Sequence, residues 1–209
     1  KPLPVITCLW ILALVTWRAA LSTPDRLLHL TLLDVGTGDA ILIQSPEGRY
    51  ILIDGGPSAS LLSNGLGRRL PPFNRHLDWL VVASPSREQI DALSGVLDRF
   101  PPDRVLWAGP DSPSRAADYL RETLTDYQIP NTPAQNGHRL NLGHGAELKV
   151  LTSGKRGAIL LLEWDAFRAV LPLGAHEDEY KALRMGADIG PIGVLLLADN
   201  GYAPLNPPA

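Results

Sequence analysis

From Leu30 onward, short apolar runs are separated by turn residues, a pattern that predicts many buried strands. We expect strands over residues 30–33, 40–44, 50–53, 77–83, 105–108, 138–140, 146–151, 158–164, 167–171 and 193–197. Apolar residues at helical spacing predict a helix over Ile90–Phe100, and Ser114 is a suitable N-cap for a helix reaching Tyr127. Short helices are predicted within 57–70 and over Glu177–Met185. Strands alternating with single helices predict an α/β sandwich, with sheets inside and helices outside.

The N-terminal segment has a different pattern, because Leu3–Trp17 is almost wholly apolar and is followed by Arg18. Its length is short of the roughly 20 residues of a full membrane span, but Trp10 and Trp17 suit a membrane interface. We predict a membrane helix over residues 1–22, the end of a longer membrane region, then a linker over 23–29 and a globular domain over 30–209. A signal-peptide core cleaved near Ala19-Ala20 and a buried core helix are the alternatives.

Composition narrows the function classes. The net charge is −3 and charged residues make up 20% of the chain, which argues against broad electrostatic binding of nucleic acid. Local arginine patches remain candidates for a nucleic-acid surface, namely Arg68, Arg69, Arg75 and Arg87. Cys8 is the only cysteine, so neither a disulfide framework nor a thiolate zinc site is expected.

Two glycine motifs follow predicted strands and place carboxylates at strand ends. The first is Asp34-Val-Gly-Thr-Gly-Asp39 and the second is Asp54-Gly55-Gly56. The first motif lacks the Lys-Ser/Thr pair of a phosphate-binding loop and does not open a helix, so a structural turn is the better interpretation. Together the motifs predict a sheet with acidic groups at one rim.

The segment LDVGTGDAILIQSPEGRYILIDGG resembles the opening of the metallo-β-lactamase-like domain at the C-terminal end of ComEC-type DNA-internalisation (competence) proteins. The resemblance extends from about Leu30 to Asn206. It implies a metallo-β-lactamase-like αββα sandwich that follows membrane helices, at the cell membrane with the globular domain on the extracytoplasmic side. It also implies that Asp54 is a structural residue that braces the metal-ligand loop by hydrogen bonds.

The family's metal ligands are replaced in this sequence. The family motif H-x-H-x-D-H follows a buried strand and would hold zinc or manganese through imidazole and carboxylate groups. At the matching positions stand Ser84, Ser86, Glu88 and Gln89. Ala175 and Asp199 occupy two further ligand positions of the family. We therefore predict no metal, no cofactor and no catalytic residue in this degenerate site.

These observations predict a catalytically degenerate ComEC-like domain with a structural or binding role in DNA uptake, and not an enzyme. The expected partners are single-stranded DNA, the membrane and a membrane channel domain of the same system. One alternative is a metal-dependent nuclease or phosphodiesterase in which Asp54, Glu88 and Asp199 hold Mg²⁺ or Mn²⁺. The other is a membrane-anchored interaction protein with no link to DNA.

Overall fold

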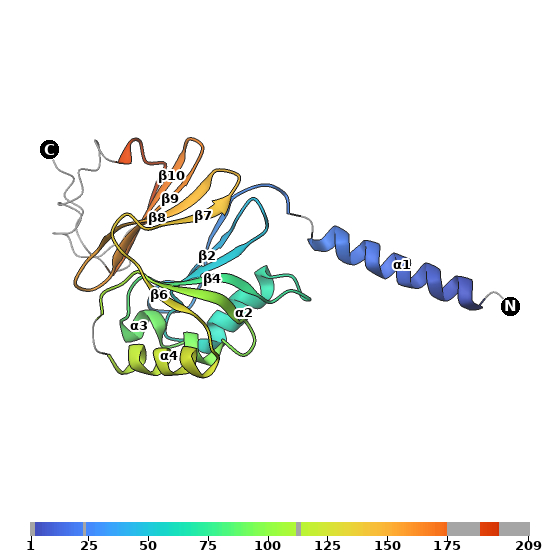
Figure 1. Cartoon of the computed structure of the whole chain (residues 1–209), viewed down its shortest axis with the longest axis horizontal. Helices are drawn as coiled ribbons and strands as arrows, with labels where there is room; N and C mark the ends of the chain where they lie inside the picture. The colour runs from blue at the N-terminus through green and yellow to red at the C-terminus, as the bar shows by residue number, and fades with distance from the viewer. Residues whose placement is uncertain (1–2, 23, 112–113, 175–188, 197–209) are drawn as a thin grey trace.

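The computed structural model describes residues 3–22, 24–111, 114–174 and 189–196. Two β-sheets pack face to face, and helices cover the outer face of the first sheet (Figure 1). The N-terminal sheet has the order β1 (His29–Leu32), β2 (Ile41–Gln44), β3 (Tyr50–Ile53), β4 (Leu77–Val82), β5 (Pro102–Trp107) and β6 (Asn131–Pro133). The C-terminal sheet has the order β11 (Val194–Leu195), β10 (Phe167–Leu173), β9 (Ala158–Trp164), β8 (Ala146–Ser153) and β7 (Arg139–Gly143).

Strand alternation divides the core into two layers. Ile41, Ile43 and Ile51 point between the two sheets, whereas Leu42 and Leu52 point toward the helices. Because both faces are covered, β2 and β3 are apolar at nearly every position. Strands β3 to β6 are parallel, so their carboxyl ends lie at one rim of the sheet. The predicted sandwich of sheets with outer helices is therefore observed on this side.

The helices match the predictions unevenly. Helix α4 (Arg115–Asp126) begins after Ser114, whose hydroxyl accepts from the backbone N–H of Ala117, as predicted. Helix α2 (Ala59–Arg69) fills most of a segment for which only a short helix and loop were predicted. The predicted helix over 177–185, which would cover the C-terminal sheet, lies outside the described residues. The fourth layer of the predicted αββα sandwich therefore stays a prediction.

The helix predicted over Ile90–Phe100 is wrong. The chain forms the short helix α3 (Arg87–Ile90) and then a 3₁₀ turn over Leu93–Gly95. The Gln89 carbonyl accepts from the backbone N–H groups of Gly55 and Gly56 and so makes no bond within a longer helix. Tertiary hydrogen bonds thus replace the helical ones at this point.

Helix α1 (Leu3–Ser22) occupies the segment for which we predicted a membrane helix. Its described side chains, over 6–17, are mostly more than half exposed, so the alternative of a buried core helix is wrong. No helix in the described part of the chain is both long and apolar enough to cross a membrane. The prediction of a membrane-spanning helix is therefore not supported.

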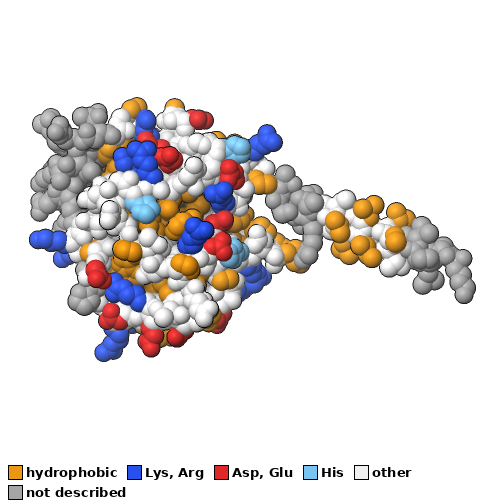
Figure 2. All heavy atoms as spheres, in the orientation of Figure 1, with side chains coloured by type: hydrophobic (Ala, Val, Ile, Leu, Met, Phe, Trp, Pro, Cys, Tyr) orange, Lys and Arg blue, Asp and Glu red, His pale blue; other side chains and the backbone are white. Residues whose placement is uncertain are grey.

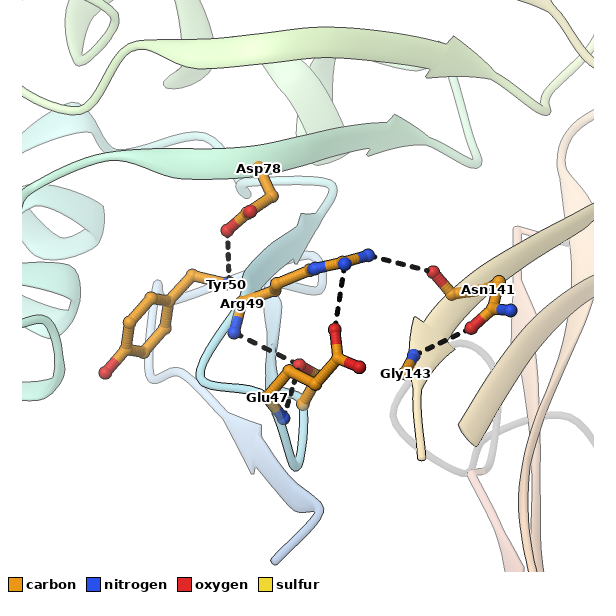
Figure 3. A network of polar contacts seen from close by, with 7 residues as sticks. Glu47, Arg49, Tyr50, Asp78, Asn141 and Gly143 are labelled. Carbon is orange, nitrogen blue, oxygen red and sulfur yellow. Dashed lines mark hydrogen bonds and ion pairs between the residues drawn. The ribbon is translucent and has the colours of Figure 1, made fainter. Parts of the chain in front are cut away.

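A polar network joins the turn between β2 and β3 to the C-terminal sheet (Figure 3). The Arg49 guanidinium pairs with Glu47 at 2.8 Å and donates to the Asn141 carbonyl at 3.5 Å. A Cβ at Gly143 would lie 2.1 Å from the carboxyl carbon of Glu47, so this position favours glycine. Elsewhere on the face drawn in Figure 2, positive and negative side chains are interspersed, in keeping with the balanced charge of the chain.

Candidate functional site

Asp54 lies at the rim where β3 and β4 end, and its side chain is completely buried, with 0% of its surface exposed. Its Oδ1 accepts from the backbone N–H of Ala83 at 2.8 Å, and its Oδ2 accepts from the backbone N–H of Ser84 at 3.2 Å. Burial raises the pKa of the Asp54 carboxyl well above its usual range, although these two hydrogen bonds oppose the shift. Asp54 thus braces the turn after β4, as the family resemblance implies.

Ser84, which the resemblance matches to the first metal ligand, is also buried, with 2% of its surface exposed. Its hydroxyl donates to the carbonyl oxygen of Arg156 at 2.9 Å, across to the loop between β8 and β9. A Cβ at Gly174 would lie 2.5 Å from this hydroxyl oxygen. The absence of a side chain at Gly174 therefore leaves the room that the Ser84 side chain occupies.

Gln89, at the last position of the motif, holds the glycine loop before β2. Its side-chain oxygen accepts from the backbone N–H of Asp39 at 2.6 Å, and its amide nitrogen donates to the Asp39 carboxylate at 3.0 Å. Through its own carbonyl it also binds Gly55 and Gly56, both at 2.8 Å. One residue therefore ties together three segments of the rim, and we call the contact between its side chain and Asp39 the Gln89–Asp39 pair.

The remaining predicted positions are not brought into this cluster. Ser86 is an exposed N-cap of α3 whose side chain makes no capping bond, and Glu88 is exposed in the same short helix. Ala175 and Asp199 lie outside the described residues.

The chemistry of this rim does not fit a catalytic metal. Within the described ranges, no three or more His, Cys, Asp or Glu residues are grouped so that they could hold a metal ion. The described histidines are dispersed: His29 pairs with Asp25 at 2.6 Å, and His76 pairs with Asp103 at 2.7 Å. The hydrogen-bonding groups of Asp54, Ser84 and Gln89 contact the protein itself. Among the described residues, the arrangement supports a rim braced by hydrogen bonds within the chain.

Sequence reasoning found Asp54 and the replaced ligand positions but missed two partners. The carbonyl of Arg156 carries no side-chain signal, so its bond to Ser84 could not be predicted. Asp39 was identified only as the end of a turn, although an acidic side chain closing a glycine loop was a usable sign that it has a partner.

Replacing Gln89 with glutamate tests the Gln89–Asp39 pair. The new carboxylate cannot donate to Asp39 and adds a like charge, so we expect a loss of about 1–2 kcal/mol in the free energy of unfolding at pH 7. Repulsion raises the pKa of the carboxyl pair in the folded protein above its value in the unfolded chain, so the loss shrinks as the pH falls through this raised pKa and is smallest at about pH 4 and below. Urea unfolding at pH 7 and pH 4 measures both effects.

Gln135 is the matched control, because it is exposed and the change Gln135→Glu adds the same charge. That variant should unfold within about 0.5 kcal/mol of the parent chain. Equal losses in the two variants would show that the Gln89–Asp39 pair contributes nothing.

Comparisons with known proteins bear on the fold of the chain. No protein-family model and no curated protein matches the chain. Among solved structures, the chain is similar to a metallo-β-lactamase from Cronobacter sakazakii with a HARLDQ motif, with a TM-score of 0.49 and 15% identity over 75% of this chain and 61% of that one. It is also similar to MEM-A1, a subclass B3 metallo-β-lactamase isolated from a soil metagenome library. The TM-score is 0.45, and the identity is 16% over 66% of this chain and 58% of that one.

The metallo-β-lactamase fold protein YhfI from Bacillus subtilis is a third similar structure, with a TM-score of 0.46 and 15% identity over 65% of this chain and 55% of that one. The chain thus spans 55–61% of the length of these three proteins. Their likeness is to proteins of the metallo-β-lactamase fold, and at these TM-scores and identities it carries no conclusion about activity.

Proposed function

We propose that the chain is a catalytically degenerate metallo-β-lactamase-like domain of the ComEC type, with a structural or binding role in DNA uptake. The observation that carries this proposal is the Gln89–Asp39 pair, in which a residue at a ligand position has become a structural brace. Ser84 supports it, because its hydroxyl binds the Arg156 carbonyl. The site retains its shape through hydrogen bonds within the chain.

The exposed apolar side chains of helix α1 form a candidate partner surface. Such a surface supports a position of the chain beside the membrane and its channel domain. Several large apolar side chains of α1, among them Leu9, Trp10 and Leu12, are at least 60% exposed. Isolated apolar residues are common on surfaces, but a helix that exposes so many of them is typical of an interaction site. We therefore propose a location at the cell membrane, on its extracytoplasmic side, with a membrane channel domain and single-stranded DNA as partners.

The competing function is a metal-dependent nuclease or phosphodiesterase that uses carboxylate ligands. Of the three carboxylates it requires, Asp54 has both oxygens engaged by backbone N–H groups in a buried position, and Glu88 is exposed. Asp199 lies outside the described residues. A buried carboxyl with a raised pKa is a poor ligand for a hard cation, so the described residues favour the non-catalytic role.

Metal content and nuclease activity of the purified full chain provide the test. After incubation with Mn²⁺ or Zn²⁺ and desalting, we expect well under 0.1 metal ion per chain by elemental analysis, roughly background for a site with no ligand set. We also expect no metal-dependent cleavage of single-stranded DNA. A ratio of about one metal ion per chain, together with cleavage, would establish the nuclease instead.

DNA binding separates the competence role from an interaction protein unconnected with DNA. The ComEC-type role predicts measurable affinity for a single-stranded oligonucleotide, weakening as salt is raised because cations leave the phosphates on binding. A folded chain with no affinity at low salt would leave only a protein or membrane partner.

A further inference from the structure

Two adjoining hollows lie on the helix side of the N-terminal sheet, and both are lined by Arg68 and Arg69 from the last turn of α2. The first, which we call the arginine hollow, has a volume of about 280 Å³ and is also lined by His29, Thr31, Gln44 and Tyr50. The second, the leucine hollow, has a volume of about 320 Å³ and is also lined by Leu32, Leu33, Leu61 and Asp34. They form one groove between edge strand β1 and α2.

Strand register places the polar groups of the arginine hollow in a row. His29 pairs with Gln44, and Gln44 pairs with Tyr50, so the three side chains share one face of neighbouring strands. Figure 3 shows the Tyr50 ring directed away from Arg49 and Asn141, which lie on the side of the C-terminal sheet. Tyr50 begins β3 and Asp54 follows its end, so the arginine hollow lies at the opposite end of these strands from the braced rim.

The arginine hollow is rich in donors and has no carboxylate in its lining. Arginine, histidine, tyrosine, threonine and glutamine side chains can all donate hydrogen bonds. Burial raises the pKa of the Tyr50 phenol, which keeps its hydroxyl protonated. The acids nearest to this set, Asp25 and Asp78, bind His29 and the Tyr50 backbone N–H respectively.

Arg68 and Arg69 have no carboxylate partner within the described ranges. Both arginines line the hollow, so an anion bound there would meet two positive charges. Planar guanidinium groups match the oxygens of a phosphate in paired hydrogen bonds. The first hollow therefore has the charge and the geometry of a phosphate site.

The leucine hollow adds an apolar wall to the groove and limits the negative charge that a bound ligand can carry. Leu33 packs against the core on the helix side, and Leu61 of α2 is 42% exposed beside it. Asp34 also lines the leucine hollow. A ligand with a second phosphate beside it would meet a carboxylate, so an extended polyanion such as nucleic acid is disfavoured here.

We propose that this groove binds a phosphate monoester that carries an apolar chain, with the phosphate at Arg68 and Arg69 and the chain along Leu33 and Leu61. Its phosphate belongs to a soluble metabolite or to a lipid headgroup of the phosphatidic acid type. The groove is separate from the braced rim, so this proposal does not rest on the proposed function.

Isothermal titration of the full chain with inorganic phosphate and with octyl phosphate tests the proposal. We expect octyl phosphate to bind about tenfold or more tightly than inorganic phosphate, because its chain covers Leu33 and Leu61. The double variant Arg68→Gln, Arg69→Gln should weaken the binding of both ligands about tenfold or more. The variant Leu61→Asn should weaken octyl phosphate several-fold and leave inorganic phosphate unchanged.

Arg104→Gln is the matched control, since Arg104 is an exposed arginine on β5 outside both hollows, and it should bind like the parent chain. Binding that is unaffected by the double arginine variant would overturn the proposal, as would equal affinity for the two ligands. An oligonucleotide that displaces octyl phosphate would also overturn it, in favour of a nucleic-acid site. Arginine-dependent binding to vesicles containing phosphatidic acid would identify a lipid source, and binding only to soluble esters a metabolite.

Discussion

Replacing Asp54 with alanine is expected to lower the free energy of unfolding by about 3 kcal/mol. The substitution removes the acceptors of two backbone N–H groups, those of Ala83 and Ser84, which are buried in the folded chain. An unpaired buried donor costs about 1–3 kcal/mol, and two are created here. Urea unfolding followed by circular dichroism measures the loss.

Asp165 provides the control, because it has the same left-handed backbone conformation as Asp54, with φ near 50°, but is exposed. Asp165→Ala therefore reports the backbone effect alone, and we expect a loss of about 1 kcal/mol or less. Losses of similar size in the two variants would mean that the buried hydrogen bonds of Asp54 contribute little.

Asp54→Asn separates the hydrogen bonds from the charge. The amide oxygen can still accept, and the amide does not ionise, so stability near neutral pH should stay close to that of the parent. In the parent chain the folded-state pKa of Asp54 is raised, so the folded state holds its proton at pH values where the unfolded state has lost it. Its stability is therefore fully present below about pH 4 and declines as the pH rises through the folded-state pKa, and this part of the decline should be absent in Asp54→Asn.

The second large effect is expected for Gly38→Ala in the glycine loop before β2. Gly38 has φ of +84°, and a Cβ there would lie 2.1 Å from the backbone carbonyl oxygen of Glu88. Backbone cannot move aside as a side-chain tip can, so the loop must lift and the Gln89–Asp39 pair must break. We expect a loss of about 2–4 kcal/mol in thermal or urea unfolding, the sum of conformational strain and the lost contacts.

Gly36 tests whether the clash or the backbone conformation is responsible. It has φ of +89°, but a Cβ there would meet nothing closer than 3.8 Å. Gly36→Ala should therefore cost only the left-handed conformation, about 1–2 kcal/mol. If the two alanine variants unfold alike, the packing of Gly38 against Glu88 is not what holds the loop.

The sequence was most informative where burial dictates the pattern. Strand β3, buried on both faces, was predicted at its observed bounds, and α4 was predicted from the capping chemistry of Ser114. Strand β6 was missed, because Asn131–Pro133 is short, fully exposed and polar. The helix over Ile90–Phe100 was predicted from a sound apolar periodicity, and it failed because Gly55 and Gly56, distant in sequence, bind the Gln89 carbonyl.

The residues of the candidate site could be identified from the sequence, but their hydrogen-bond partners could not. Ser84 and Gln89 could be recognised as poor metal ligands from residue type alone. Their present partners come from segments far along the chain, Arg156 for Ser84 and Asp39 for Gln89. Such pairings depend on how loops meet at the rim, and spacing within one segment carries no information on that.

The hydrogen bonds of Asp54, Ser84 and Gln89 also bear on how the chain matures in the cell. In proteins whose ligands converge on an ion, folding of the site is coupled to metal supply, and chelation or starvation leaves it incomplete. Here the described rim is joined by the chain's own backbone and side chains. Under the proposed function we therefore expect the described part of this rim to form whether zinc and manganese are scarce or abundant.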